Sequence, residues 1–267
     1  MTTRASHHAA TVGVIGGSLL LLALLVTPVI MLVVRGGEEG IRQLGMDAEL
    51  RAALALTGAA ATIATLVAVL LGTPLAYLLA RGRMPAGWLV SALLDVPLLI
   101  PHPVAGIALL LAFGRASPTG EVLERIGLGI VGSPLGIGLA MLFVAAPLYV
   151  SAAREAIERV EPRLEAVART LGDSPWRAVR RVTLPLAKRG LSAAAVVMWA
   201  RAVSEFGAIV ILTYNPKVVS VLSYDRFTAY GLDAALPVAA VLVLLALVPL
   251  LMLRTLRAGA EPVARAS

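Results

Sequence analysis

Long runs of apolar residues, separated by short charged segments, dominate the chain. Two intervals, 52–80 and 126–153, hold no Asp, Glu, Lys or Arg. A helix needs about 20 mostly apolar residues to cross about 30 Å of hydrocarbon. This criterion predicts six transmembrane helices, over residues 11–34, 53–80, 86–114, 133–153, 190–213 and 234–253. The pattern predicts an all-α membrane protein with a single transmembrane domain over 1–267.

The composition narrows the function classes further. Apolar residues make up 59% of the 267 residues and charged residues only 15%, whereas soluble domains are about half apolar and a quarter charged. Aromatic residues, at 4%, are too few for a nucleic-acid surface, despite the net charge of +7. There is no cysteine, and histidine occurs only at 7, 8 and 102. We therefore expect no metal, no cofactor, no catalytic residue and no nucleic-acid partner; the partner is membrane lipid.

The basic residues predict the orientation in the cell membrane. Of 23 Lys and Arg residues, 15 lie in the N-terminus, the second and fourth loops and the C-terminal tail, nine of them in the fourth loop. Basic residues collect on the cytoplasmic side. Both termini and the fourth loop, residues 154–189, are therefore predicted to be cytoplasmic.

The fourth loop is too charged for the bilayer and shows helical periodicity. Pro162 suits a first helical turn, and Gly172 can end that helix as a left-handed cap. Asp173 or Ser174 can cap a second helix, which Pro185 is expected to break or kink before the next span. An apolar stripe runs along the first helix at Leu164, Val167, Ala168 and Leu171. Periodicity alone leaves two interpretations open: a docking element, or a helical hairpin lying on lipid headgroups.

The same loop resembles the EAA loop of ABC importer permeases. The stretch 166–172 is followed, after nine residues, by 182–185, which reads Val-Thr-Leu-Pro. Gly172, Leu184 and Pro185 match that motif in register. Ala166 stands where the family usually has Glu, and Glu165 is one position earlier. The resemblance implies an ATPase-coupling role for Arg163, Glu165, Ala166, Val167, Ala168, Arg169, Thr170, Leu171, Gly172, Asp173 and Ser174.

Two further segments, 100–107 and 199–208, resemble the molybdate/tungstate permeases, which are relatives of the sulfate permeases. This resemblance implies a type I ABC importer permease fold and a homodimer of six-span subunits. It also implies two ATP-binding cassette subunits and a periplasmic or extracellular oxyanion-binding protein. The chain has no Gly-x-x-x-x-Gly-Lys-[Ser/Thr] loop to hold phosphates, so ATP is expected to act through a partner.

Polar residues inside the predicted spans are candidates for a pathway or for an intramembrane brace. They are Asp95, His102, Arg201, Ser204 and Glu205. Charges within a bilayer usually face protein or water and find partners. Counting from the inner helix ends predicts that Asp95 pairs with Arg201, which Glu205 shares from one turn away. Nearby prolines, at 97, 101 and 103, are expected to break or kink the third span.

We therefore interpret the chain as the membrane subunit of an ATP-driven molybdate or tungstate importer. Arg115, Lys217 and Arg226, in the outer loops, are candidates for docking the binding protein. One alternative is a permease for sulfate or another small oxyanion. Another is a proton-coupled secondary transporter, in which Asp95, Arg201 and Glu205 form a proton relay.

Overall fold

A computed structural model describes the conformation of residues 2–258 and the side-chain surroundings of residues 14–249. Within this range the regular elements are all helices. They are α1 (Thr2–Met46), α2 (Ala48–Ala80), α3 (Gly87–Leu99), α4 (His102–Phe113), α5 (Pro118–Arg125) and α6 (Pro134–Glu158). They continue with α7 (Pro162–Thr170), α8 (Pro175–Ala178), the π-helix η1 (Val179–Thr183), α9 (Leu184–Val203), α10 (Gly207–Leu212), α11 (Val219–Tyr230) and α12 (Leu232–Ala258).

Helix α6 packs between α2 and α9 and forms the centre of the bundle. Small residues allow the helices to approach closely, as is usual in membranes. A Cβ atom at Gly190 of α9 would lie 2.4 Å from the Cβ of Ala156 on α6. Two turns earlier on α6, Tyr149 is fully buried against Gly72 of α2. The core of the described residues is accordingly rich in alanine.

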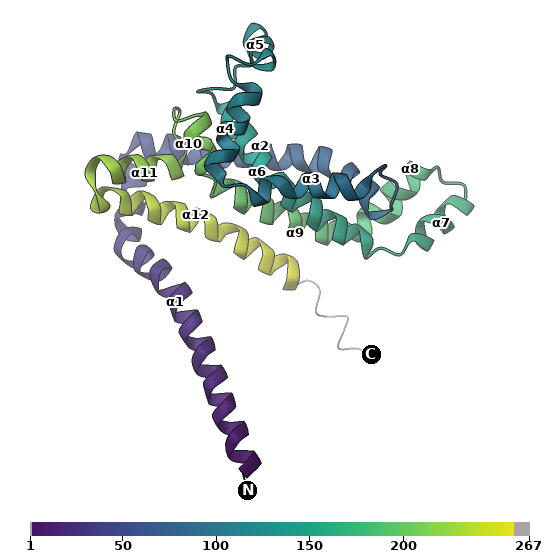
Figure 1. Cartoon of the computed structure of the whole chain (residues 1–267), viewed down its shortest axis with the longest axis horizontal. Coiled ribbons are helices and arrows are strands. Elements are labelled where there is room, and N and C mark those ends of the chain that lie inside the picture. Colours follow the sequence, from purple (N-terminus) through teal and green to yellow (C-terminus); the bar gives the residue numbers. More distant parts are fainter. Residues whose placement is uncertain (1, 259–267) are drawn as a thin grey trace.

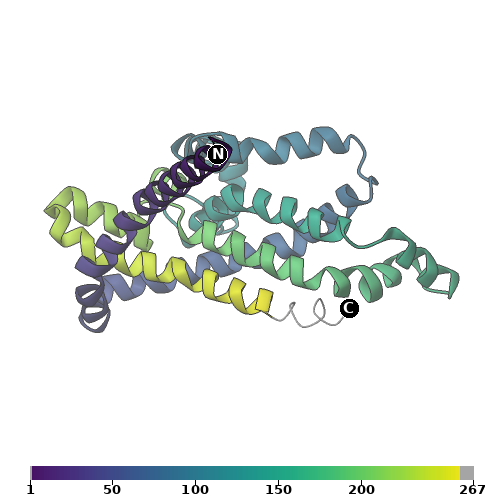
Figure 2. The ribbon, with the colours of Figure 1, turned by 90° about the horizontal axis from the view of Figure 1, so that it is seen from below.

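The two ends of the bundle carry different elements. Helices α7 and α8 project from one end, and α11 lies at the opposite end (Figures 1 and 2). Helix α1 contacts α12 near its own C-terminal end, and its N-terminal part extends away from the other helices (Figure 1). The side chains of residues 14–31 on α1 are all exposed in the single chain.

The structure confirms four or five of the six predicted spans. In the described part of the chain, four helices are long and apolar enough to cross a membrane: α1, α2, α6 and α12. A fifth span is obtained if α3 and α4 are counted together. Helix α9 does not meet the same criterion, because Lys188, Arg189 and Arg201 interrupt its apolar sequence. It also ends at Val203, ten residues before the predicted end of the fifth span.

The third predicted span is broken near its middle, as its prolines predict. Helix α3 ends at Leu99 and α4 starts at His102, and the two helix axes differ by 115°. Pro101 precedes α4 and has a backbone φ of −56°. Because the ring of proline removes a backbone donor and disfavours helical backbone at the preceding residue, Pro101 accounts for the break between α3 and α4.

Candidate functional site

The predicted cytoplasmic loop contains a short helix with well-formed ends. Helix α7 starts at Pro162, in its first turn. It ends in a Schellman motif, in which the amide of Gly172 donates to the carbonyl of Arg169 and the amide of Asp173 donates to that of Ala168, both at 3.1 Å. Gly172 has a φ of +98°. The left-handed cap predicted at this glycine is therefore confirmed.

The second half of the loop differs in one respect from the prediction. Ser174 caps α8, whose first residue is Pro175, as expected. Pro185 does not break the helix, because α8, η1 and α9 follow one another without interruption. The π turn at Val179–Thr183 immediately precedes the proline, and such a turn can accommodate a distorted hydrogen-bond ladder within one continuous helix.

Glu165 is the buried residue of this segment. Its Oε1 accepts hydrogen bonds from Arg81 Nη2 at 2.7 Å and Nε at 3.0 Å, and from the Thr183 hydroxyl at 2.6 Å. Its Oε2 accepts from the Tyr77 hydroxyl at 2.9 Å. The Arg81 and Glu165 side chains are only 6% and 9% exposed. This cluster, Tyr77–Arg81–Glu165–Thr183, therefore joins the end of α2, helix α7 and the start of α9.

The charge state of Glu165 follows from these contacts. Burial on its own would raise the pKa of this carboxyl. Hydrogen bonds from Thr183, Arg81 and Tyr77, together with the charge of Arg81, outweigh burial and hold the pKa of Glu165 below its usual value. The carboxylate is therefore ionised at neutral pH and the ion pair with Arg81 is intact.

The sequence predicted a coupling role for Glu165 but not its three hydrogen-bond partners, Tyr77, Arg81 and Thr183. The sequence did hold one indication that Glu165 is important: it is an acidic residue one position before the usual Glu of the motif. Thr183 lies inside the second part of the motif, and Arg81 is the first charged residue after the apolar run of α2. No local spacing connects residues 84 positions apart, so this contact required the tertiary structure.

The apolar stripe of α7 faces away from the rest of the chain. Leu164, Val167 and Leu171 are exposed, and Leu171 reaches 83%. The acidic residue of the helix is thus buried, whereas its apolar residues are available to another molecule. This is the reverse of an ordinary amphipathic helix on a soluble protein, and it indicates that a partner or a lipid surface covers the stripe.

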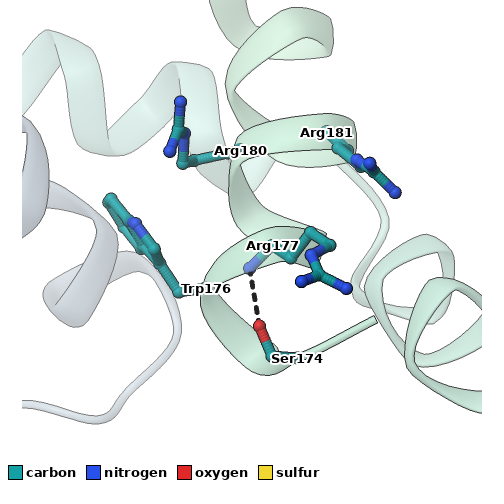
Figure 3. Close-up of a pocket in the computed structure, with 5 residues that line it drawn as sticks. All are labelled: Ser174, Trp176, Arg177, Arg180 and Arg181. Carbon is teal, nitrogen blue, oxygen red and sulfur yellow. Dashed lines mark hydrogen bonds between the residues drawn. The ribbon is translucent and has the colours of Figure 1, made fainter. Parts of the chain in front are cut away.

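A basic cavity of about 470 Å³ adjoins this segment. Ser174, Trp176, Arg177, Arg180 and Arg181 line it. Trp176 and Arg180 lie on one side of the helix, and Arg177 and Arg181 lie on the other side (Figure 3). Asp173 neutralises part of the charge, through contacts with Arg181 at 3.1 Å and Arg177 at 3.8 Å.

The intramembrane polar residues form a cluster, but not the predicted one. Arg201 Nη2 lies 2.8 Å from Glu205 Oε2 and 2.6 Å from His102 Nδ1. His102 Nδ1 lies 2.7 Å from the same Glu205 oxygen. Ser204 also belongs to the cluster, because Arg201 Nη1 donates to its hydroxyl at 3.4 Å. The predicted pairing of Arg201 with Glu205 is therefore found, with His102 as a third member, although Glu205 lies beyond the end of α9 rather than on the same helix.

The predicted ion pair between Asp95 and Arg201 is wrong. Within the described part of the chain, Asp95 makes no ion pair. It lines a separate cavity of about 250 Å³ between α3 and α6, next to Ser91, Arg154 and Glu158. The 115° bend after α3 separates the two residues: it is the first residue of α4, His102, that meets Arg201.

The three candidate docking residues, Arg115, Lys217 and Arg226, differ in how exposed their side chains are and in how many ion pairs they make. Lys217 donates to Asp225 at 2.6 Å and to Glu49 at 3.3 Å, and Arg226 pairs with Asp47 and Glu49. The contact with Lys217 lowers the pKa of Asp225 and raises that of the lysine. Arg115 pairs with Glu124, at 3.2 Å, and is 73% exposed. The first two side chains thus hold the outer loops together, and Arg115 is the exposed one.

Comparison with solved structures defines the class of protein. The chain superposes on the permease of a bacterial alginate ABC transporter, solved in complex with an alginate pentasaccharide-bound periplasmic protein, with a TM-score of 0.68. The match covers 94% of this chain and 93% of that chain at 16% identity. The fold is therefore that of a type I ABC importer permease.

Sequence comparison then identifies the family. Residues 72–260 match the family described as "Binding-protein-dependent transport system inner membrane component", and the chain belongs to this family. It is 45% identical to the molybdate/tungstate transport system permease protein WtpB of Thermococcus kodakarensis, over 73% of this chain and 74% of that relative. It is 30% identical to the sulfate transport system permease protein CysT of Escherichia coli, over 77% of this chain and 76% of that relative.

Proposed function

We propose that this chain is the permease subunit of an ATP-driven importer of molybdate and tungstate. The observation that carries the proposal is the 45% identity to a molybdate/tungstate permease over nearly three quarters of both chains. Family membership favours ATP-driven import over the ion-driven alternative, because family members are membrane components of binding-protein-dependent systems.

The α7 segment is the proposed site of contact with ATPase subunits. Its exposed residues Leu164, Val167 and Leu171 offer an apolar ridge, and the Arg81–Glu165 pair holds the helix against α2. A helix fixed in this way can transmit the closing of a partner to the bundle as a rigid body. In this arrangement the segment is cytoplasmic, which agrees with the excess of basic residues in the loop.

A homodimer is the proposed assembly. The exposed apolar part of α1, residues 14–31, touches little of its own chain. An apolar groove of about 430 Å³ also lies between α2 and α6, and its lining includes Ile63, Val67 and Leu139. A second copy and the lipid bilayer together would cover these surfaces. The oxyanion-binding protein would approach away from α7, and the exposed Arg115 is a candidate contact for it.

Sulfate is the second candidate substrate, favoured by the 30% identity to a sulfate permease. Molybdate, tungstate and sulfate are all tetrahedral dianions. Their discrimination is expected to depend largely on the binding protein, because that protein meets the free anion first.

The test is uptake into proteoliposomes that hold the permease, its ATPase subunits and its binding protein. We expect ATP-dependent uptake of radiolabelled molybdate, which unlabelled tungstate suppresses at lower concentration than sulfate. Preferential suppression by sulfate would assign the system to sulfate. Uptake under a proton gradient without ATP would contradict the proposal and support the ion-driven alternative.

A further inference from the structure

Two helix breaks meet at the Arg201–Glu205–His102 cluster. The first lies between α3 and α4, and the second between Val203, where α9 ends, and Gly207, where α10 begins. Helix α10 packs on α4, and a Cβ at Gly207 would lie 2.7 Å from the Cβ of His102. Non-helical backbone at membrane depth is tolerated where it is buried in protein or lines a watery cavity. Polar sites in transporters are commonly built where helices are interrupted in this way.

The contacts of Glu205 are completed from within the chain. Its side chain is 1% exposed. Its Oε1 accepts a hydrogen bond from the amide of Ala208 at 2.8 Å, and its Oε2 faces Arg201 and His102. The carboxylate therefore has no open side for a ligand, and its charge is balanced by the arginine.

The donors of the cluster, in contrast, are incompletely used. The guanidinium of Arg201 has five N–H donors. In the described part of the chain, Nη2 serves Glu205 and His102, Nη1 makes one long contact with Ser204, and Nε has no partner. Arg201 is 23% exposed, His102 is 40% exposed, and Ser204 is also exposed. Unused hydrogen-bond donors thus reach the surface beside a buried counter-charge.

A buried carboxylate with complete contacts beside an arginine with unused donors is suited to weak binding of an anion. A lone arginine in a pathway would hold a dianion too strongly, because conduction requires binding that is also easy to release. With Glu205 as its partner, Arg201 keeps its directional donors while the net charge of the pair is zero. Such a pair can bind an oxyanion through hydrogen bonds without retaining it by charge.

We propose that Arg201, flanked by Ser204 and His102, is a transient contact for tetrahedral oxyanions in the translocation pathway, and that Glu205 is the counter-charge that keeps this contact weak. The inference rests on the proposed function, since it assumes that the chain conducts such anions. Arg201 supplies the donors, because the Ser204 hydroxyl donates its proton to the Arg201 carbonyl at 3.0 Å. Glu205 is a positioning residue that acts through the arginine.

The experiment compares three variants in the complete reconstituted complex, with radiolabelled molybdate as the probe. Arg201→Gln removes the donors of the guanidinium. Glu205→Gln keeps the shape but leaves the arginine uncompensated. The double variant R201Q/E205Q restores a net charge of zero without restoring the guanidinium. Glu158→Gln is the matched control, because Arg154 and Glu158 form another Arg–Glu pair one helical turn apart, on α6.

We expect the turnover of transport per folded complex to fall about tenfold or more in R201Q, which corresponds to about 1.4 kcal/mol. E205Q should also slow turnover, while the complex retains molybdate about tenfold more tightly after washing. The double variant should regain folded yield but not transport. The control should stay within twofold of wild type.

Other outcomes would overturn the proposal. If R201Q/E205Q regains both folded yield and transport, the pair is a structural brace. If E205Q does not increase retention of molybdate, Glu205 is not a counter-charge for an anion contact. Wild-type uptake separates the two hypotheses: a wild type that carries sulfate alone changes the substrate assignment but leaves the contact intact. A folded wild type that carries none of the three anions rejects the proposed function, and the contact with it.

Discussion

The Arg81–Glu165 and Arg201–Glu205 pairs have the same chemistry and opposite surroundings. In the first, both side chains are less than a tenth exposed, and Tyr77 and Thr183 occupy the remaining positions around the carboxylate. In the second, the carboxylate is equally buried but the guanidinium is 23% exposed. The first pair connects the end of α2 with α7, whereas the second lies where two broken helices meet.

The difference shows that an ion pair does not by itself reveal its role. Desolvating two charges is costly, and the attraction between them offsets this cost only when further hydrogen bonds complete the site. Around Glu165 the site is complete, so the pair is suited to holding helices in place. Around Arg201 donors are left over, so the pair is suited to meeting a ligand.

The largest expected effect comes from opening the closed pair. Arg81→Met would leave the Glu165 carboxylate buried without its cation, at a cost of about 3–5 kcal/mol. We expect a large loss of folded complex in membranes and a lower unfolding temperature after solubilisation. The double variant R81M/E165M removes both charges and should recover much of this loss. A loss below about 1 kcal/mol for R81M would mean that the pair contributes little to the structure.

A smaller effect is expected at Gly172, just after the C-terminal end of α7. Here the backbone conformation, and not an ion pair, fixes the direction of the chain. Gly172 has a φ of +98°, and a side chain in the left-handed region costs about 1–2 kcal/mol. Gly172→Val should therefore lower transport and transport-coupled ATP hydrolysis several-fold while membrane insertion stays normal.

Gly127→Val is the matched control for this variant. Gly127 has a φ of +77°. At both Gly127 and Gly172, an added Cβ would have no neighbouring atom within 4 Å, apart from the adjacent residues, so a substitution strains only the backbone. It lies in the loop after α5, away from the α7 segment. Equal loss of coupling in both variants would mean that backbone strain, rather than the position of the α7 segment, accounts for the effect.

The smallest effect is expected at the Arg115–Glu124 ion pair, whose side chains are the most exposed of the three pairs compared. Arg115 and Glu124 are 73% and 43% exposed, and such pairs contribute about 0–1 kcal/mol to stability. Arg115→Gln should leave the unfolding temperature nearly unchanged. It should slow association with the binding protein and weaken its salt dependence, because rim charges act mainly on encounter.

Lys217→Gln provides the contrast, since Lys217 is only 20% exposed and holds Glu49 and Asp225. We expect this variant to lower the unfolding temperature more than it changes association. Stopped-flow measurement of docking at several salt concentrations checks both variants. An unchanged salt dependence in R115Q would remove Arg115 from the proposed interface.

Much of the local structure could be predicted from the sequence. The helix start at Pro162, the cap at Gly172 and the cap at Ser174 all lie where the residues indicate, because each depends on a few neighbouring backbone groups. The break before His102 was also predictable, since Pro101 acts on its own chain. Prolines did not decide every case, however. At Pro185 the helix continues through a π turn, which sequence pattern alone does not distinguish from a break.

The sequence by itself determined which residues lie in the apolar helices and which charges are neighbours along the chain. Arg201 and Glu205 meet because they are only four residues apart, although α9 ends between them at Val203. Only the tertiary structure decided the contacts between helices, which depend on helix rotation and on the angle of each break. The 115° bend before α4 brings His102 to Arg201 and leaves Asp95 in another cavity. The contacts of Glu165 with Tyr77 and Arg81 at the end of α2 likewise turn the acidic side of α7 inward and leave its apolar stripe exposed, because a buried carboxylate requires a complete set of hydrogen-bond partners.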